Sequence, residues 1–463
     1  MKKELLKNTL FIAIGKFSTQ VISYLLLPLY TKVLSTSEYG TYDFIVTACI
    51  FIVPFITMLM EDSMFRFLID AEKQEEKNSI MSNTIIYSLI SLSIWSILLF
   101  IILNLVSYEY TVVFILYIIS CILITLMNSI TRGIGRFKFY SICNFILSVS
   151  TIILNIVLIT IFKLGANGLL YSTIISNVIT SIFMFFKLKI YNNIKVKYLN
   201  RIKIKEMLKY SYPLTANSIG WSIINISDRL IITFILGSGA NGIYAIANKF
   251  PNILNTFASF FFLAFKENAS KALKEIDYKA YYNNMLKTIH NLFVSISLLL
   301  ITFMPFIFNI FINKAYIDAK NYIPILIIAL YYGNIAGYYG SLLIAFKDTK
   351  TIGKSTVIGS ILNLLINFLL IKYIGIYAAV ISTLVSNYIT NLYRSIKIKK
   401  YINLDKINNY YFSILLLFLT TIIYYINNLY MNMISLILVI IYSICINKET
   451  IIGFINIIKN RKK

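Results

Sequence analysis

The chain has 463 residues, of which 58% are hydrophobic and 13% are charged, and its mean hydropathy is +0.77. Soluble proteins contain about 45–50% apolar and about 25% charged residues, so this composition excludes a soluble globular protein. Apolar stretches of about twenty residues recur along the whole sequence, and each is long enough to cross a bilayer as a helix. The stretches are continuously apolar rather than alternating, which favours helices over a transmembrane barrel.

Taken in chain order, these stretches predict an all-α, polytopic membrane protein with about 14 transmembrane helices. The predicted spans are residues 9–33, 41–65, 82–106, 111–131, 139–162, 168–186, 210–236, 243–265, 288–313, 321–346, 355–374, 377–393, 410–426 and 431–447.

The chain has a formal net charge of +24, and its basic residues are distributed unequally between the two sides of the membrane. With the N-terminus in the cytoplasm, 35 Lys and Arg residues fall in cytoplasmic segments and five in outer segments. This asymmetry predicts that both termini are cytoplasmic. The positive charge is thereby accounted for by topology, and nucleic-acid binding is not expected.

Two sequence echoes indicate an internal repeat. "KELLK" at 3–7 is repeated as "KEMLK" at 205–209. "STIISN" at 172–177 is repeated as "STLVSN" at 382–387. The segments that contain this second pair begin at Gly165 and Gly375. Six spans separate the copies, and an even number means that both halves enter the membrane in the same direction. The repeats are therefore predicted to be parallel and to surround a central cavity.

The repeat predicts four regions. They are an N-terminal six-helix lobe (1–186), a basic cytoplasmic linker (187–209), a C-terminal six-helix lobe (210–397), and two extra transmembrane helices with a basic tail (398–463). We expect the linker to be a solvated connector and the two extra helices to be peripheral.

Polar residues form stripes on the first two predicted spans of each half. Such stripes predict a water-filled cavity, although single polar residues of this kind also serve as interhelical hydrogen bonds. The residues that would bind substrate there are Lys16, Gln20, Asn217, Asn225, Arg229, Asn248 and Lys249, and the acids that would couple transport to an ion are Asp43, Glu61 and Asp228.

Arg229 is the central residue of this prediction. Asp228 is expected to offset the charge of Arg229 while the cavity is empty. In the second span, Pro54 is expected to kink the helix. Lys16, Arg229 and Lys249 would form a cationic wall, unless Lys16 and Lys249 extend to the nearby membrane surface. Such a wall suits an anionic cargo, and a guanidinium is well shaped for phosphate.

Nothing in the sequence indicates catalysis, a metal or a cofactor. The four cysteines fall in different spans without a CxxC pair, which is typical of packing residues. His290 is the single histidine and is expected to be an interfacial side chain.

The chain resembles the polysaccharide-repeat-unit (Wzx-type) oligosaccharide flippases of the multidrug/oligosaccharidyl-lipid/polysaccharide (MOP) exporter superfamily. The resemblance rests on "GKFSTQVISYLLLPLYTKVLSTSEYGTYDF" (15–44), "DRLIITFILGSGANGIYAIANKF" (228–250) and the fourteen-span layout. It implies a bacterial cytoplasmic (inner) membrane protein that moves an undecaprenyl-pyrophosphate-linked oligosaccharide to the outer leaflet by alternating access, for capsule, lipopolysaccharide or exopolysaccharide synthesis. Membrane lipids, a polysaccharide polymerase and a chain-length regulator are the implied partners.

Two alternatives remain open. A MATE-type cation-coupled exporter would share the two halves, but its cargo is usually cationic. A membrane polysaccharide polymerase or ligase would act on the same lipid-linked substrates, but it needs a sizeable outer loop, and the predicted outer loops are about ten residues or shorter.

Overall fold

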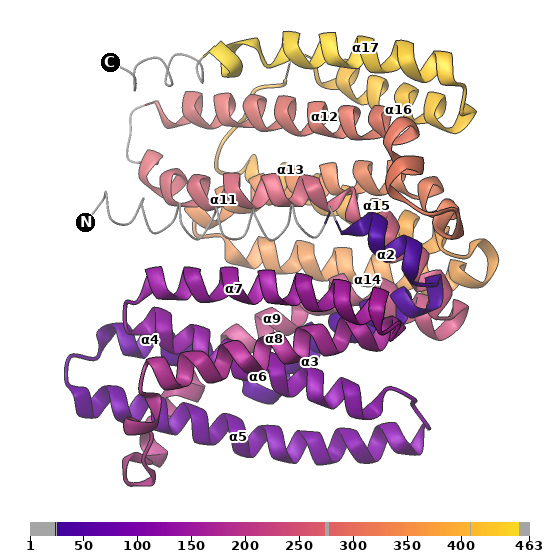
Figure 1. Cartoon of the computed structure of the whole chain (residues 1–463). Coiled ribbons are helices and arrows are strands. Elements are labelled where there is room, and N and C mark those ends of the chain that lie inside the picture. Colours follow the sequence, from indigo (N-terminus) through magenta and orange to yellow (C-terminus); the bar gives the residue numbers. More distant parts are fainter. Residues whose placement is uncertain (1–23, 25, 274–276, 408, 453–463) are drawn as a thin grey trace, which may run out of the picture. The chain divides into compact units, whose positions relative to one another are not determined.

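The computed structural model describes residue 24 and residues 26–273, 277–407 and 409–452. Every regular element in these residues is helical (Figure 1), which confirms the all-α fold class. The chain divides into two compact units, Met1–Leu230 and Ile231–Lys463. Each unit is described by itself.

Unit 1 comprises a succession of helices joined by short connections. They are α2 (Leu27–Val33), α3 (Thr36–Thr57), α4 (Met60–Asp70), α5 (Gln74–Leu105), α6 (Thr111–Gly133), α7 (Phe137–Ile156), the π-helical turn η1 (Val157–Ile161), α8 (Gly165–Lys187), the 3-10 turns η2 (Ile190–Asn192) and η3 (Val196–Tyr198), and most of α9 (Arg201–Leu236).

Unit 2 begins near the end of α9. Its further elements are α10 (Ser238–Lys249), α11 (Asn252–Ala272), α12 (Tyr278–Phe311), the 3-10 segment η4 (Lys314–Asn321), α13 (Ile323–Ala345), α14 (Thr349–Ile374), α15 (Tyr377–Ile398), α16 (Tyr410–Ile426) and α17 (Leu429–Ile446).

Length and hydropathy establish a multi-pass membrane protein. Nine helices within the described residues are long and apolar enough to cross a bilayer, namely α3, α5, α6, α7 with η1, α8, α12, α13, α14 and α17. The apolar helix α16 has 17 residues. The predicted eighth span is interrupted between α10 and α11. The total of fourteen spans remains a prediction.

The start of α3 shows how local sequence sets a helix boundary. The Ser35 hydroxyl accepts a hydrogen bond from the Glu38 backbone N–H (3.2 Å), and the Glu38 carboxylate accepts one from the Ser35 N–H (2.8 Å). This reciprocal capping box satisfies two backbone donors that a helix start leaves unpaired.

The predicted second span is broken, but not at Pro54. Pro54 lies inside α3, and the break follows at Met58 and Leu59, which have φ values of 50° and 49°. A proline removes one backbone hydrogen bond from the helix, whereas two successive left-handed residues end it. The single predicted span 41–65 is therefore two helices, α3 and α4.

The two echoed segments can be compared in the units that contain them. Gly165 (φ 55°) is the first residue of α8, and Gly375 (φ 58°) caps the end of α14 two residues before α15 begins. Asn177 of α8 donates to Ser120 Oγ of α6 (3.2 Å), and Asn387 of α15 donates to the Ala329 carbonyl of α13 (3.0 Å). Each echoed segment thus bonds to a neighbouring helix of its own unit through its last asparagine, with a serine hydroxyl as the acceptor in unit 1 and a backbone carbonyl in unit 2.

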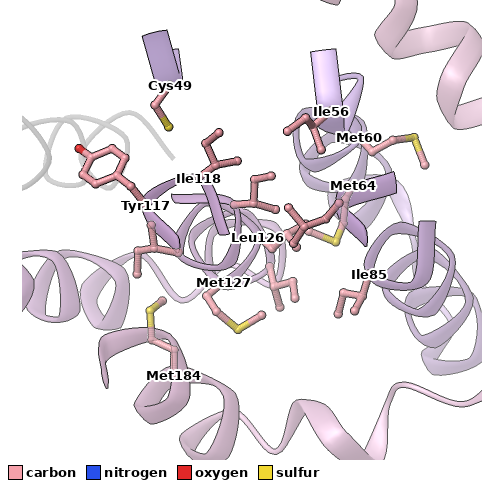
Figure 2. Close-up of a cluster of buried hydrophobic side chains, with 14 of the residues drawn as sticks. Cys49, Ile56, Met60, Met64, Ile85, Tyr117, Ile118, Leu126, Met127 and Met184 are labelled. Atoms are coloured by element: carbon pink, nitrogen blue, oxygen red, sulfur yellow. The ribbon is translucent and has the colours of Figure 1, made fainter. Parts of the chain in front are cut away.

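The core of unit 1 is rich in methionine. Figure 2 shows Ile56, Met60, Met64, Ile85 and Leu126 among the clustered side chains, which are all buried. Methionine is flexible and fills irregular gaps, which suits the packing beside a broken helix. This core fixes α4 against α5 and α6.

The basic linker is docked rather than freely solvated. Ser79 and Asn83 of α5 donate to the Tyr198 carbonyl (3.2 and 3.0 Å), and the Lys195 backbone N–H donates to Ser82 Oγ (3.1 Å). The expectation of a solvated connector is wrong for this part because its backbone polar groups pair with α5.

The last two helices pack against α12 of unit 2. Figure 1 shows α16 and α17 beside α12, and both contact it. His290 of α12 is buried, with 1% of its surface exposed. It lies 2.7 Å from the Tyr331 hydroxyl and 3.2 Å from Ser413 Oγ of α16. The prediction that His290 is interfacial is therefore wrong, whereas α16 and α17 pack on α12 and keep much of their own surface exposed.

Candidate functional site

An ion pair between α3 and α9 marks the candidate site in unit 1. Arg229 Nε lies 2.6 Å from Asp43 Oδ2, and the side chains are 20% and 14% exposed. The short distance is typical of a charge-assisted hydrogen bond. The pair places a cation and an anion together within apolar helices while leaving part of each side chain accessible.

A cavity of about 330 Å³ adjoins this ion pair. One face of α3 and one face of α9 supply its walls, because the lining positions recur every three or four residues. The lining residues are Asp43, Val46, Thr47, Ile50, Ser218, Ser222, Ile226 and Arg229. The cavity therefore combines hydroxyl groups, a carboxylate and a guanidinium on an apolar background.

The counter-ion of Arg229 differs from the predicted one. Asp228 is buried, with 5% of its surface exposed, but the ion pair that the structure gives Arg229 is with Asp43. Adjacent residues of a helix point about 100° apart, so Asp228 and Arg229 do not face each other. The prediction that Asp228 offsets Arg229 is corrected in favour of Asp43.

Aromatic residues lie next to the ion pair in the chain. Tyr39, one helical turn before Asp43, is buried, and its ring centroid lies 6.5 Å from that of Tyr30 and 6.0 Å from that of Tyr42. Tyr30 accepts a hydrogen bond from Asn155 Nδ2 (2.8 Å). These contacts hold the first turns of α3 in position and thereby help to place Asp43.

Glu61 is a second buried acid in unit 1, at the start of α4. It is 3% exposed, and its Oε1 accepts a hydrogen bond from Thr57 Oγ1 (3.1 Å). Among the described residues, its Oε2 has no hydrogen-bond partner. A carboxyl group is costly to bury without partners for both oxygens, so Glu61 is a candidate for a functional rather than a packing role.

The other predicted substrate-binding residues lie in unit 2 or outside the described residues. Lys249 and Asn248 lie in α10 of unit 2, where Asn248 Nδ2 donates to the Tyr244 carbonyl of its own helix (2.9 Å). Lys16 and Gln20 lie outside the described residues, as do the side chains of Asn217 and Asn225. Their substrate-binding roles remain predictions.

Sequence reasoning missed Arg394 of α15, which is 5% exposed. Its guanidinium donates to Ser355 Oγ (2.8 Å), Thr356 Oγ1 (2.9 Å) and the Ala336 carbonyl (3.0 Å). Among the described residues these acceptors are neutral, and no acid pairs with it. The feature of the sequence that could have pointed to Arg394 is its position directly after the predicted span 377–393.

The architecture has close counterparts among solved structures. The lipid II flippase MurJ in an inward closed conformation has a TM-score of 0.71 and 20% identity, covering 96% of this chain and 100% of MurJ. An inward-facing multidrug resistance MATE transporter of the MOP superfamily has a TM-score of 0.69 and 15% identity, covering 84% and 98%. The Vibrio cholerae MATE transporter VcmN has a TM-score of 0.54 and 15% identity, covering 86% and 97%.

Sequence comparison identifies the family. No curated protein matches the chain. The model of the family described as "Polysaccharide biosynthesis protein" matches residues 5–265, more than half of the chain. The fold relatives are a flippase and transporters rather than enzymes. The chain therefore belongs to the polysaccharide biosynthesis protein family and has the fold of the MOP superfamily transporters.

Proposed function

We propose that the protein is a flippase that moves an undecaprenyl-pyrophosphate-linked oligosaccharide repeat unit from the cytoplasmic to the outer leaflet by alternating access. It would act in the bacterial cytoplasmic membrane, with both termini in the cytoplasm, and supply a surface polysaccharide pathway. The family match and the fold support this proposal. The observation that carries it at the level of residues is the accessible Asp43–Arg229 pair beside a polar cavity.

The chemistry of this pair suits the release and capture of an anion. A pyrophosphate that leaves water needs replacement partners, because an unpaired charge is expensive in a medium of low dielectric. A guanidinium carries five N–H donors in a planar fork. Arg229 can therefore exchange its hydrogen bond to the Asp43 carboxylate for hydrogen bonds to phosphate oxygens, or donate to both groups at once. Asp43 would keep Arg229 compensated whenever no cargo is bound.

Ion coupling, if the flippase uses it, is assigned in this proposal to Asp43, Glu61 and Asp228. Asp43 would act through its ion pair with Arg229, and Glu61 would contribute a second, buried carboxyl group. Lys16 and Lys249 would add point charges to the substrate-binding surface. A polymerase and a chain-length regulator are the proposed partners of the pathway.

The test is a flipping assay in proteoliposomes that contain a fluorescent undecaprenyl-pyrophosphate oligosaccharide. The wild-type protein should flip the lipid, Arg229→Ala should lose at least tenfold in rate, and Arg229→Lys should recover part because charge returns without the forked grip. Wild-type protein that folds, inserts and leaves this lipid in its original leaflet would contradict the proposal.

A MATE-type exporter is the second candidate, supported by the likeness to MATE transporters. The two functions separate in a strain that lacks the corresponding gene. Loss of surface polysaccharide with unchanged drug resistance supports the flippase, whereas sensitivity to cationic drugs with normal polysaccharide supports the exporter.

A further inference from the structure

Unit 2 contains a cavity of about 270 Å³ that the proposed transport cycle does not use. It lies between α12, α13, α15 and the segment that leads into α16. Aromatic rings form much of its wall, and they belong to His290, Tyr331, Tyr339, Tyr388, Tyr410 and Tyr411. The centroid of Tyr410 lies 5.4 Å from that of His290, so the deep side of the cavity is a packed aromatic surface.

The mouth of the cavity has an excess of positive charge. Its charged lining residues are Lys399, Asp405 and Lys406. Asp405 is already compensated, because it lies 3.6 Å from Lys279 Nζ and accepts a hydrogen bond from Asn283. In the part of the chain that the structure describes, neither Lys399 nor Lys406 has an acidic partner. Two uncompensated ammonium groups therefore flank an aromatic hollow.

The position of the mouth indicates which anion it meets. It lies where α15 ends and α16 begins, at the end of these helices that the charge distribution assigns to the cytoplasm. Leu392 is 44% exposed and Tyr411 is 78% exposed beside the mouth, so apolar and aromatic surface adjoins the lysines. Lysine together with tyrosine is characteristic of the membrane–water interface, where anionic lipid headgroups are concentrated.

We propose that this cavity binds the phosphodiester headgroup of an anionic membrane phospholipid. The phosphate would lie between the ammonium groups of Lys399 and Lys406, with tyrosine hydroxyls as further donors. The acyl chains would run along the exposed surface at Leu392 and Tyr411. Basic pockets between transmembrane helices on the cytoplasmic side bind headgroups by this combination of charge and shape. The proposal does not depend on which cargo the protein carries.

Two double variants give a matched test. Lys399→Gln with Lys406→Gln removes both cavity lysines. Lys397→Gln with Lys400→Gln removes the same charge from the same segment, but these lysines lie over the rings of Tyr393 and Tyr401 and do not line the cavity. Phosphatidylglycerol is titrated into each full-length protein in detergent, and bound lipid is measured by native mass spectrometry. The cavity variant should bind roughly 30-fold more weakly than the wild type, and the control variant should bind like the wild type.

The single variant Lys406→Glu is a second test, because this residue is exposed and lies outside the helices, so we expect the fold to tolerate the replacement. Lys406→Glu should weaken phosphatidylglycerol binding at least as much as removal of one lysine charge does, because it also adds a negative charge. Equal binding by the wild type and both cavity variants would overturn the proposal. Glycerophosphoglycerol, the phosphodiester headgroup of phosphatidylglycerol without its acyl chains, serves as the soluble probe. Binding of this probe as tight as that of phosphatidylglycerol would show a site for soluble phosphate and would also overturn the lipid assignment.

Discussion

Asp43 and Arg229 lie 186 residues apart in the sequence and 2.6 Å apart in the structure, measured between Oδ2 and Nε. Removing one partner leaves the other charge without its counter-ion in a partly buried place, which is strongly destabilising for a fully buried pair. Because this pair is partly exposed, we expect Asp43→Ala or Arg229→Ala to lower the free energy of unfolding by about 1–3 kcal/mol. The Asp43→Ala, Arg229→Ala double variant should recover most of this loss, as measured by thermal unfolding in detergent.

Arg66 and Asp70 provide the control, because their N–O distance is also 2.6 Å but their side chains are 48% and 62% exposed. Arg66→Ala should change stability by less than about 0.5 kcal/mol. Flipping by the double variant decides the role of Arg229. A stable but inactive double variant supports phosphate binding by Arg229. Full activity of the double variant would show that the ion pair has only a structural role.

Glu61→Gln should preserve folding, because the amide oxygen can still accept the hydrogen bond from Thr57. If Glu61 carries a proton in the cycle, the variant should flip lipid at a rate that no longer responds to an imposed pH gradient. Glu76→Gln is the control, since Glu76 is an exposed partner of Lys203. An unchanged response of Glu61→Gln to the gradient would exclude Glu61 as the coupling residue.

Gly165→Ala should destabilise unit 1 by more than Gly375→Ala destabilises unit 2. Both glycines have positive φ, so either substitution adds backbone strain of about 1–3 kcal/mol. At Gly165 a Cβ would also collide with Oε1 of Glu38, whereas at Gly375 it would meet nothing within 4 Å. Thermal unfolding of the two variants measures the difference. Equal losses would mean that Glu38 moves away without cost.

Arg394→Ala should lower stability by about 2–4 kcal/mol, because three hydrogen bonds between α13, α14 and α15 are lost. Arg394→Lys should recover only part, since an ammonium cannot reproduce the planar fork. Thermal unfolding in detergent measures both variants. A fully stable alanine variant would show that the three helices pack without this residue.

Cysteine labelling tests the predicted orientation. In a background without the four native cysteines, Gly239→Cys should react with a membrane-impermeant maleimide added to intact cells, and Lys197→Cys should react only after the cells are opened. Lys197 is exposed in the docked linker, so a lack of reaction from outside reflects the membrane rather than burial. The reverse pattern would contradict the cytoplasmic assignment of both termini.

Local sequence was sufficient for the features that depend on neighbouring residues. Continuous apolar runs predicted where helices form, because a segment in a bilayer must satisfy its own backbone hydrogen bonds. The glycines at 165 and 375, which begin the echoed segments, were recognised in the sequence, whereas the start of α3 was predicted at residue 41 and the Ser35–Glu38 capping box places it at Thr36. Composition alone excluded a soluble protein.

Contacts between distant segments were decided only by the tertiary structure. The choice of Asp43 over Asp228 as the counter-ion of Arg229 depends on which helix face meets which, and periodicity on each helix separately does not define that pairing. His290 looked interfacial because it lies near a predicted span end, but packing of α16 and α17 against α12 buries it between Tyr331 and Ser413. Pairing energies of this kind arise from three-dimensional proximity, which a pattern of neighbouring residues along the chain does not record.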